Sequence, residues 1–199
     1  MAYYLVIHPN QFFTNLYSDF TFWAGVDLFF AISGFVIMNS FLKTLSQKDI
    51  NFWKACKIFW VKRVFRILPA AWFWLMIYLL LTYYFNATGA FGNISENLQD
   101  AKAAILQYAN IYGVSCWGDG GQAQCGPNGI YWSLSLEEQF YILLPILVLV
   151  FRNYFKYFLI VASLCLFFVN RPEWSWGWAL RTDAIMFGVL ISIFNQSKK

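Results

Sequence analysis

Two adjacent carboxylates open a long apolar stretch near the middle of the chain. Residues 132–141 read WSLSLEEQFY, and the apolar run ILLPILVLV follows at once. An ionisable side chain in a membrane helix costs about 2.5 to 3.5 kcal/mol at the bilayer centre, and less near the surface. A chain that carries two such acids, Glu137 and Glu138, is therefore expected to use them.

The two acids are predicted to have different tasks. Ser135 and Glu138 have the spacing of a capping box, in which the two side chains satisfy each other's backbone N–H groups at a helix start. Glu138 is thus expected to be structural. Glu137 falls one turn before Tyr141, so its carboxylate and the tyrosine phenol share a helix face. Glu137, at the outer mouth of a helix, is a candidate general base, and His8, which is also placed on the outer side, is the other candidate.

Three further side chains could serve the same chemistry. His8 is the single histidine, and a lone histidine is more often structural than catalytic. Arg63 and Arg66 are three residues apart, so both guanidinium groups can reach one anion from one helix face. The alternative is a lipid-headgroup anchor, because residues 50–66 suit a basic helix that lies on the membrane and turns inward at Pro69.

Other charged side chains lie at the start of apolar stretches. Asp27 precedes Ser33 and Gly34, whose small side chains favour close helix contact. The structural alternative for Asp27 is an interhelical pair with a cation such as Arg181. Arg181 and Asp183 are two residues apart, on different sides of a helix, so each is expected to find its own partner. A structural network and a substrate-orienting task both fit them.

The composition defines the elements that must position these residues. Of 199 residues, 60% are hydrophobic and 12% charged, about half the charge of a soluble domain, so we predict an integral membrane protein. The predicted spans lie near residues 21–42, 67–85, 130–151, 154–169 and 178–194. Residues 2–7 are too short to span and are expected to be the remainder of a first helix. The predicted fold is all-α, a transmembrane bundle of five complete spans plus a partial first helix, forming one partial domain over residues 1–199.

The positive charges predict the orientation of this bundle. All but three of the 14 lysines and arginines lie between the first two spans, after the third or at the C-terminus. The positive-inside rule then places the C-terminus in the cytoplasm and the loop 86–129 outside. Because the charges form no basic face, the net charge of +4 does not indicate nucleic-acid binding.

The outer loop contains Cys116 and Cys125 in a glycine-rich stretch. A disulfide is easily closed over so short a loop in an oxidising compartment, and two free thiols are the alternative. No spacing of cysteine and histidine suggests a metal site.

Four segments together resemble the acyltransferase 3 family of integral-membrane acyltransferases. They are residues 22–35 (FWAGVDLFFAISGF), 62–69 (KRVFRILP), 132–141 with the following Leu144-Pro145, and 181–188 (RTDAIMFG). Their order and spacing match the family over the chain after residue 20. The resemblance implies that an acyl group moves from a cytoplasmic acyl-CoA, expected to be acetyl-CoA, to a hydroxyl at the outer face, commonly on a carbohydrate.

The resemblance also assigns residues. His8 matches a functional histidine of the family, although the arginine that precedes it there would fall before Met1. Arg63 and Arg66 match a two-arginine motif on the donor side, and Glu137 matches the motif glutamate. We therefore expect the arginines to hold the CoA phosphates inside while His8, helped by Glu137, deprotonates the acceptor outside. The residues expected to support substrate or structure are Asp27, Tyr141, Arg181 and Asp183.

The expected partners are membrane lipid, acyl-CoA as a co-substrate and a carbohydrate or other cell-envelope acceptor, with no permanently bound cofactor. The expected location is the bacterial inner membrane. The alternative is a non-catalytic membrane protein, either a solute transporter or an accessory remnant. A transporter should show a pair of helices broken by Gly or Pro, and Pro69 and Pro145 are not clearly paired. The sequence identifies neither the acyl group nor the acceptor.

Overall fold

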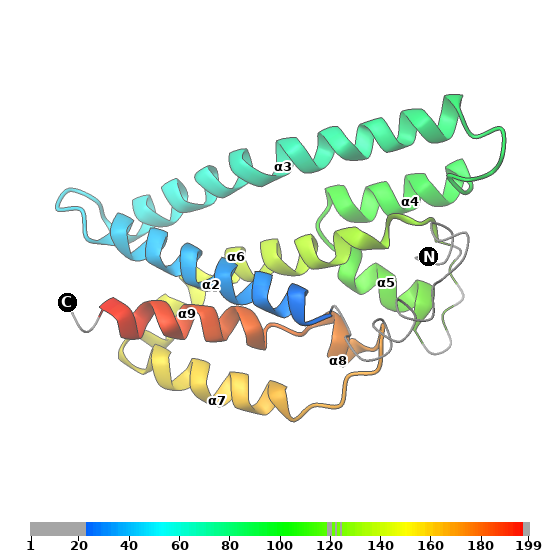
Figure 1. Cartoon of the computed structure of the whole chain (residues 1–199). Helices are drawn as coiled ribbons and strands as arrows, with labels where there is room; N and C mark the ends of the chain where they lie inside the picture. Colours follow the sequence, from blue (N-terminus) through cyan, green and yellow to red (C-terminus); the bar gives the residue numbers. More distant parts are fainter. Residues whose placement is uncertain (1–22, 119–120, 122, 124, 197–199) are drawn as a thin grey trace, which may run out of the picture.

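The computed structural model describes residues 23–118, 121, 123 and 125–196. Every regular element in this part of the chain is a helix, which confirms the predicted all-α bundle. The long helices run alternately in opposite directions (Figure 1). They are α2 (Trp23–Leu45), α3 (Phe52–Tyr84), α6 (Tyr131–Phe151), α7 (Phe155–Phe167) and α9 (Asp183–Gln196).

Four segments of the described residues are long and apolar enough to cross a membrane. They are Gly25–Leu45, Phe52–Tyr84, Asn128–Phe167 and Trp176–Gln196. The third segment contains both α6 and α7, which the sequence predicted as two spans. Because α7 has only 13 residues, its length of about 20 Å is less than the roughly 30 Å of a hydrocarbon core. By length and composition the described residues thus hold four candidate spanning segments, and in the third of them α6 and α7 run in opposite directions (Figure 1).

Helix α3 is continuous through Pro69, so the predicted surface helix that turns into the membrane at this proline is wrong. The helix has 33 residues and is capped by the preceding Asn51, whose side chain accepts a hydrogen bond from the Lys54 N–H at 2.8 Å. Proline is tolerated inside membrane helices when local adjustments satisfy the freed backbone groups. Pro145 likewise lies inside the continuous helix α6. Neither proline marks the broken helix expected of a transporter.

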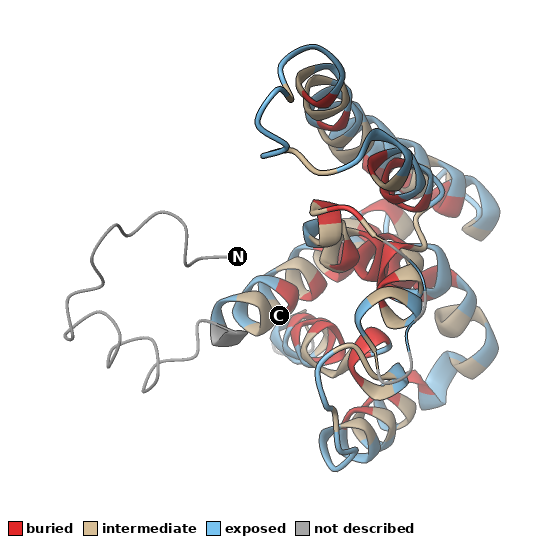
Figure 2. Ribbon diagram, turned by 90° about the vertical axis from the view of Figure 1, so that its right-hand side faces the viewer, coloured by how far each residue is buried: buried red, intermediate tan, exposed pale blue. Residues whose placement is uncertain are grey.

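Helices α2 and α9 approach closely through two glycines. A Cβ atom on Gly34 would overlap the Ile185 carbonyl, and one on Gly188 would overlap the Ala31 carbonyl. Small residues at such a contact allow two backbones to pack against each other in a membrane. The predicted packing of Gly34 is therefore confirmed. Buried residues concentrate in the body of the bundle, whereas α3 leaves most of its surface exposed (Figure 2).

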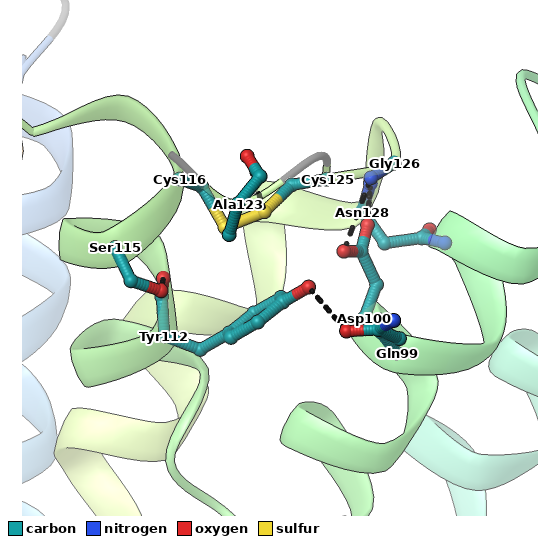
Figure 3. The surroundings of a disulfide bond; sticks show 9 residues. All are labelled: Gln99, Asp100, Tyr112, Ser115, Cys116, Ala123, Cys125, Gly126 and Asn128. Carbon is teal, nitrogen blue, oxygen red and sulfur yellow. Dashed lines mark hydrogen bonds between the residues drawn. A yellow bond between two sulfur atoms is a disulfide. The ribbon is translucent and has the colours of Figure 1, made fainter. Parts of the chain in front are cut away.

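Three shorter helices gather at the end of the bundle where α2 and α6 begin (Figure 1). They are α4 (Ile94–Ile105), α5 (Ala109–Trp117) and α8 (Trp176–Ala179). A disulfide joins Cys116, in α5, to Cys125, with Cα atoms 5.8 Å apart, so the two cysteines are not free thiols (Figure 3).

A buried carboxylate on α4 holds the chain that leads into α6. Asp100 accepts hydrogen bonds from the backbone N–H groups of Gly126, at 3.2 Å, and Asn128, at 3.0 Å (Figure 3). Burial raises the pKa of the Asp100 carboxyl above its ordinary value, and the two hydrogen bonds oppose this shift. Asp100 and the disulfide together fix the position of the segment that precedes α6. Helix α6 carries the two glutamates, Glu137 and Glu138.

Candidate functional site

A cavity of about 300 Å³ opens between α2, α3 and α6. Its polar lining consists of Ser33, Arg63, Arg66, Glu137 and Tyr141. Its apolar lining consists of Phe29, Ile32, Val36, Ile67 and Leu134. A small number of polar groups in a largely apolar concavity is the usual composition of a small-molecule site.

The arginines and the glutamate were predicted at opposite membrane faces, but the structure brings them into one cavity. Two local features explain the difference. Because α3 is continuous, Arg63 and Arg66 lie about 17 and 21 Å along it and line a cavity with residues of α2 and α6. Because α6 begins at Tyr131, Glu137 lies about 9 Å inside the helix instead of at its mouth.

Arg63 carries a buried positive charge beside the cavity. The residue is 8% exposed, and its guanidinium carbon lies 5.5 Å from the centroid of the Tyr141 ring. Among the described residues it forms no salt bridge. The nearby carboxylates of Glu137 and Glu138 offset part of the cost of burying this cation, and an electron-rich ligand oxygen would offset more of it. Arg66, one turn further along, is exposed and lines the same cavity.

Glu137 is almost fully buried, with hydroxyl groups around its carboxylate. Tyr141 donates a hydrogen bond to Glu137 Oε1, which agrees with the predicted shared helix face. The Ser33 hydroxyl group lies beside both Glu137 and Tyr141 in the cavity lining. A carboxylate, a phenol and an aliphatic hydroxyl thus meet at the cavity wall, with a guanidinium on the opposite helix.

The structure contradicts the predicted capping box. Helix α6 begins four residues before Ser135, so this serine lies inside the helix. Its hydroxyl instead accepts a hydrogen bond, at 3.2 Å, from the N–H of Ala109, the first residue of α5. Glu138 therefore does not cap the start of this helix. It is buried, and its Oε1 has no hydrogen-bond partner among the described residues.

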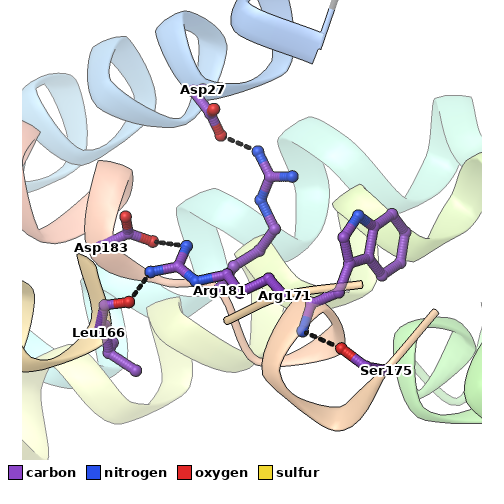
Figure 4. A network of polar contacts seen from close by, with 7 residues as sticks. Asp27, Leu166, Arg171, Ser175, Arg181 and Asp183 are labelled. Carbon is purple, nitrogen blue, oxygen red and sulfur yellow. Dashed lines mark hydrogen bonds and ion pairs between the residues drawn. The ribbon is translucent and has the colours of Figure 1, made fainter. Parts of the chain in front are cut away.

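The other charged residues singled out from the sequence are Asp27, Arg181 and Asp183. They form polar contacts outside the cavity lining (Figure 4). Arg181 pairs with Asp27 and joins the α8–α9 connection to α2, which is the structural alternative considered for Asp27. Asp183, at the start of α9, pairs with Arg171 at 2.8 Å, and Arg171 also donates to the Leu166 carbonyl. The prediction that Arg181 and Asp183 have separate partners is confirmed. This network positions α2, α7 and α9.

Ser33 is the cavity residue that sequence analysis misjudged, because we attributed it to helix packing. Successive helix residues differ by about 100° in direction. Since Gly34 faces α9, Ser33 faces elsewhere, and Phe29 and Val36, which flank it on the same side, line the cavity with it. The sequence signal that could have shown this is Gly34: if Gly34 packs against another helix, the adjacent Ser33 must face a different side of α2. His8 lies outside the described residues.

The comparisons with known proteins point to one family. A family model described as an acyltransferase domain matches residues 2–194. The chain is 32% identical over 137 residues to the peptidoglycan O-acetyltransferase OatA of Listeria monocytogenes, covering 66% of this chain and 20% of that protein. It is also 32% identical over 137 residues to the O-acetyltransferase OatA of Staphylococcus aureus, covering 66% and 21% respectively. The chain thus spans about a fifth of the length of these curated relatives.

No solved structure matches the chain. The family match covers nearly all of it, including the three helices that line the cavity. With its apolar spanning helices, the protein is an integral membrane protein, and it belongs to the family of acyltransferase domains.

Proposed function

We propose that this protein takes part in membrane O-acyl transfer, moving an acyl group from acyl-CoA to a hydroxyl on a carbohydrate of the cell envelope. The observation that carries the proposal is the cavity that unites Arg63, Arg66 and Glu137 within a domain of the acyltransferase family. Cations and a carboxylate that line one cavity are the groups that acyl transfer from a thioester needs.

The donor would enter this cavity with its reactive end. Because Glu137 lines the same space as Arg63, the group bound there must include the bond that reacts. A cavity of about 300 Å³ suits the acylated pantetheine end of the donor better than a whole nucleotide. We therefore revise the expected contact of the two arginines from the phosphates to the thioester end. The phosphates would lie towards the start of α3, where Lys54 and Lys57 are exposed.

Arg63 and Glu137 would then act on the two sides of the reaction. The buried guanidinium would stabilise negative charge that develops on the thioester carbonyl oxygen. The carboxylate would accept the proton of the attacking hydroxyl, a contribution of about 10²- to 10⁴-fold. His8, outside the described residues, stays a predicted partner of Glu137 in this step.

The acceptor class rests on the relatives. One of them is a peptidoglycan O-acetyltransferase, so we propose an acetyl donor and a sugar hydroxyl of the cell envelope as acceptor. Acyl-CoA as the donor is supported by the basic residues along the first third of α3.

Donor binding tests the proposal directly. The Arg63→Ala variant of the whole chain, in detergent or nanodiscs, is titrated with acetyl-CoA and with an acetylated pantetheine that lacks phosphates. Loss of a charge-assisted contact is expected to weaken both affinities about 10- to 100-fold. Lys62→Ala, an exposed cation on the same helix outside the cavity lining, is the matched control.

The outcomes separate the alternatives. If Arg63→Ala weakens the binding of acetyl-CoA but not of the acetylated pantetheine, Arg63 contacts the CoA phosphates and not the thioester end. Unchanged binding of both ligands would refute its assignment to the donor.

A further inference from the structure

The Ser33 hydroxyl differs from the hydroxyls of Thr44, on the same helix, and of Thr82 and Ser163, on other helices. Thr44 and Thr82 each donate to the backbone carbonyl four residues earlier, at 3.0 Å, and Ser163 donates to the Ile160 carbonyl at 3.1 Å. These bonds satisfy a hydroxyl within its own helix. Ser33 makes no such bond among the described residues, and its side chain instead lines the cavity beside Glu137 and Tyr141 of another helix.

The surroundings of Ser33 are those of an activated nucleophile. A serine hydroxyl is weakly nucleophilic until an adjacent base takes its proton, and Glu137 is such a base. Ser33 is half-buried, so a ligand in the cavity can reach it. Ile32 and Val36 give the same wall an apolar surface. Arg63, on the facing helix, supplies positive charge for an oxyanion.

We propose that Ser33 carries the acyl group as a covalent ester between the donor and the acceptor. This inference rests on the proposed function. It adds a covalent intermediate on Ser33, which the sequence analysis had assigned to helix packing. It replaces one direct transfer by two steps in the same cavity.

The two steps balance. Ser33 Oγ attacks the thioester carbonyl carbon, its proton passes to the Glu137 carboxylate, and the new C–O bond replaces the C–S bond. The departing sulfur takes the proton from Glu137 and leaves as the free thiol of CoA. The acceptor hydroxyl then attacks the Ser33 ester, its proton passes to Glu137, and Ser33 Oγ recovers that proton as it leaves. Both residues return to their starting state.

The intermediate is testable without an acceptor. The whole chain, in nanodiscs, is incubated with acetyl-CoA labelled in the acetyl group and is then digested for mass spectrometry. One acetyl group is expected on the peptide that contains Ser33. The same mixture should exchange labelled CoA into acetyl-CoA, because the first step is reversible in the absence of acceptor.

Three variants complete the experiment. Ser33→Ala should lose both the adduct and the exchange while it still binds acetyl-CoA. Ser33→Cys should keep an adduct, as a thioester cleaved rapidly by hydroxylamine, which shows that a folded protein with a nucleophile at this position is modified. Ser40→Ala, seven residues along the same helix and outside the cavity lining, should behave as the parent chain.

Two results would overturn the inference and are distinct from failure of the proposed function. Acetyl-CoA that binds normally without adduct or exchange would rule out the serine ester and leave direct transfer. An acetyl group on Tyr141 instead of Ser33 would assign the carrier to the phenol. Absence of acetyl-CoA binding by the parent chain would instead refute the proposed function and this inference with it.

Discussion

Glu137 and Glu138 are neighbours in the chain with different surroundings. Glu137 lines the cavity and receives a hydrogen bond from Tyr141. Glu138 lies outside the cavity lining and is buried, with its Oε1 unpartnered among the described residues. Substitution by glutamine keeps the size of either side chain and removes its ability to accept a proton as a base. The pair therefore allows a carboxylate in the cavity lining to be compared with a buried carboxylate outside it.

Glu137→Gln is expected to lower acyl transfer about 10²- to 10⁴-fold, because it removes the base. Glu138→Gln is expected to retain most of the activity. The measurement is the amount of ester-linked acetate in the cell envelope of cells that express each variant at equal levels. An equal loss in both variants would show that the cavity does not distinguish the two acids.

At the scale of elements, α2 has three faces with different tasks. Gly34 faces α9, Ser33 faces the cavity, and Leu28 is 63% exposed on the outer surface of the bundle. The pairing of Asp27 with Arg181 adds a polar contact near the start of the helix. Close packing against α9 therefore fixes the rotation of α2 and, with it, the direction of Ser33.

Gly34→Ala is expected to destabilise the protein by about 1 to 3 kcal/mol, because the added Cβ would overlap the Ile185 carbonyl and separate two backbones. Gly25→Ala is the matched control, since no atom lies within 4 Å of a Cβ at this position of the same helix. The measurement is the thermal unfolding midpoint in detergent. Equal midpoints for the two variants would show that α2 and α9 accommodate the added methyl group without loss of stability.

At the scale of the whole molecule, the two ends of the bundle differ in chemistry. One end holds the connection between α2 and α3 and is bordered by basic residues (Figure 1). The other end holds α4, α5 and the disulfide between Cys116 and Cys125. Disulfides persist in oxidising compartments, and basic loops favour the cytoplasm. Two independent features thus favour the same orientation.

Labelling with a membrane-impermeant maleimide is expected to confirm this orientation. In a chain in which Cys56 and Cys165 are replaced by alanine, Cys116 and Cys125 should react in intact cells only after mild reduction. A cysteine introduced by Ser46→Cys, at the exposed turn after α2, should react only after the membrane is permeabilised. Reaction of that cysteine in intact cells would reverse the assigned orientation.

Several local features followed from the sequence, and others did not. The shared face of Glu137 and Tyr141 was predictable, because residues four apart are always neighbours on a helix. The capping box was not realised, because the preceding residues extend α6 to Tyr131 and leave Ser135 available to α5. The predicted turn at Pro69 failed for a related reason, since a proline interrupts one hydrogen bond and a long membrane helix can absorb that loss.

The sequence by itself determined that the chain forms apolar spanning helices, where its positive charges lie and which motifs it carries, because these depend on composition and on spacing along the chain. Only the tertiary structure decided that Ser33, Arg63 and Glu137 line one cavity. A membrane helix is apolar on nearly all sides, because lipid is as apolar as the interior of the bundle. Its sequence therefore does not reveal which face turns inward, and only packing against other helices fixes that direction.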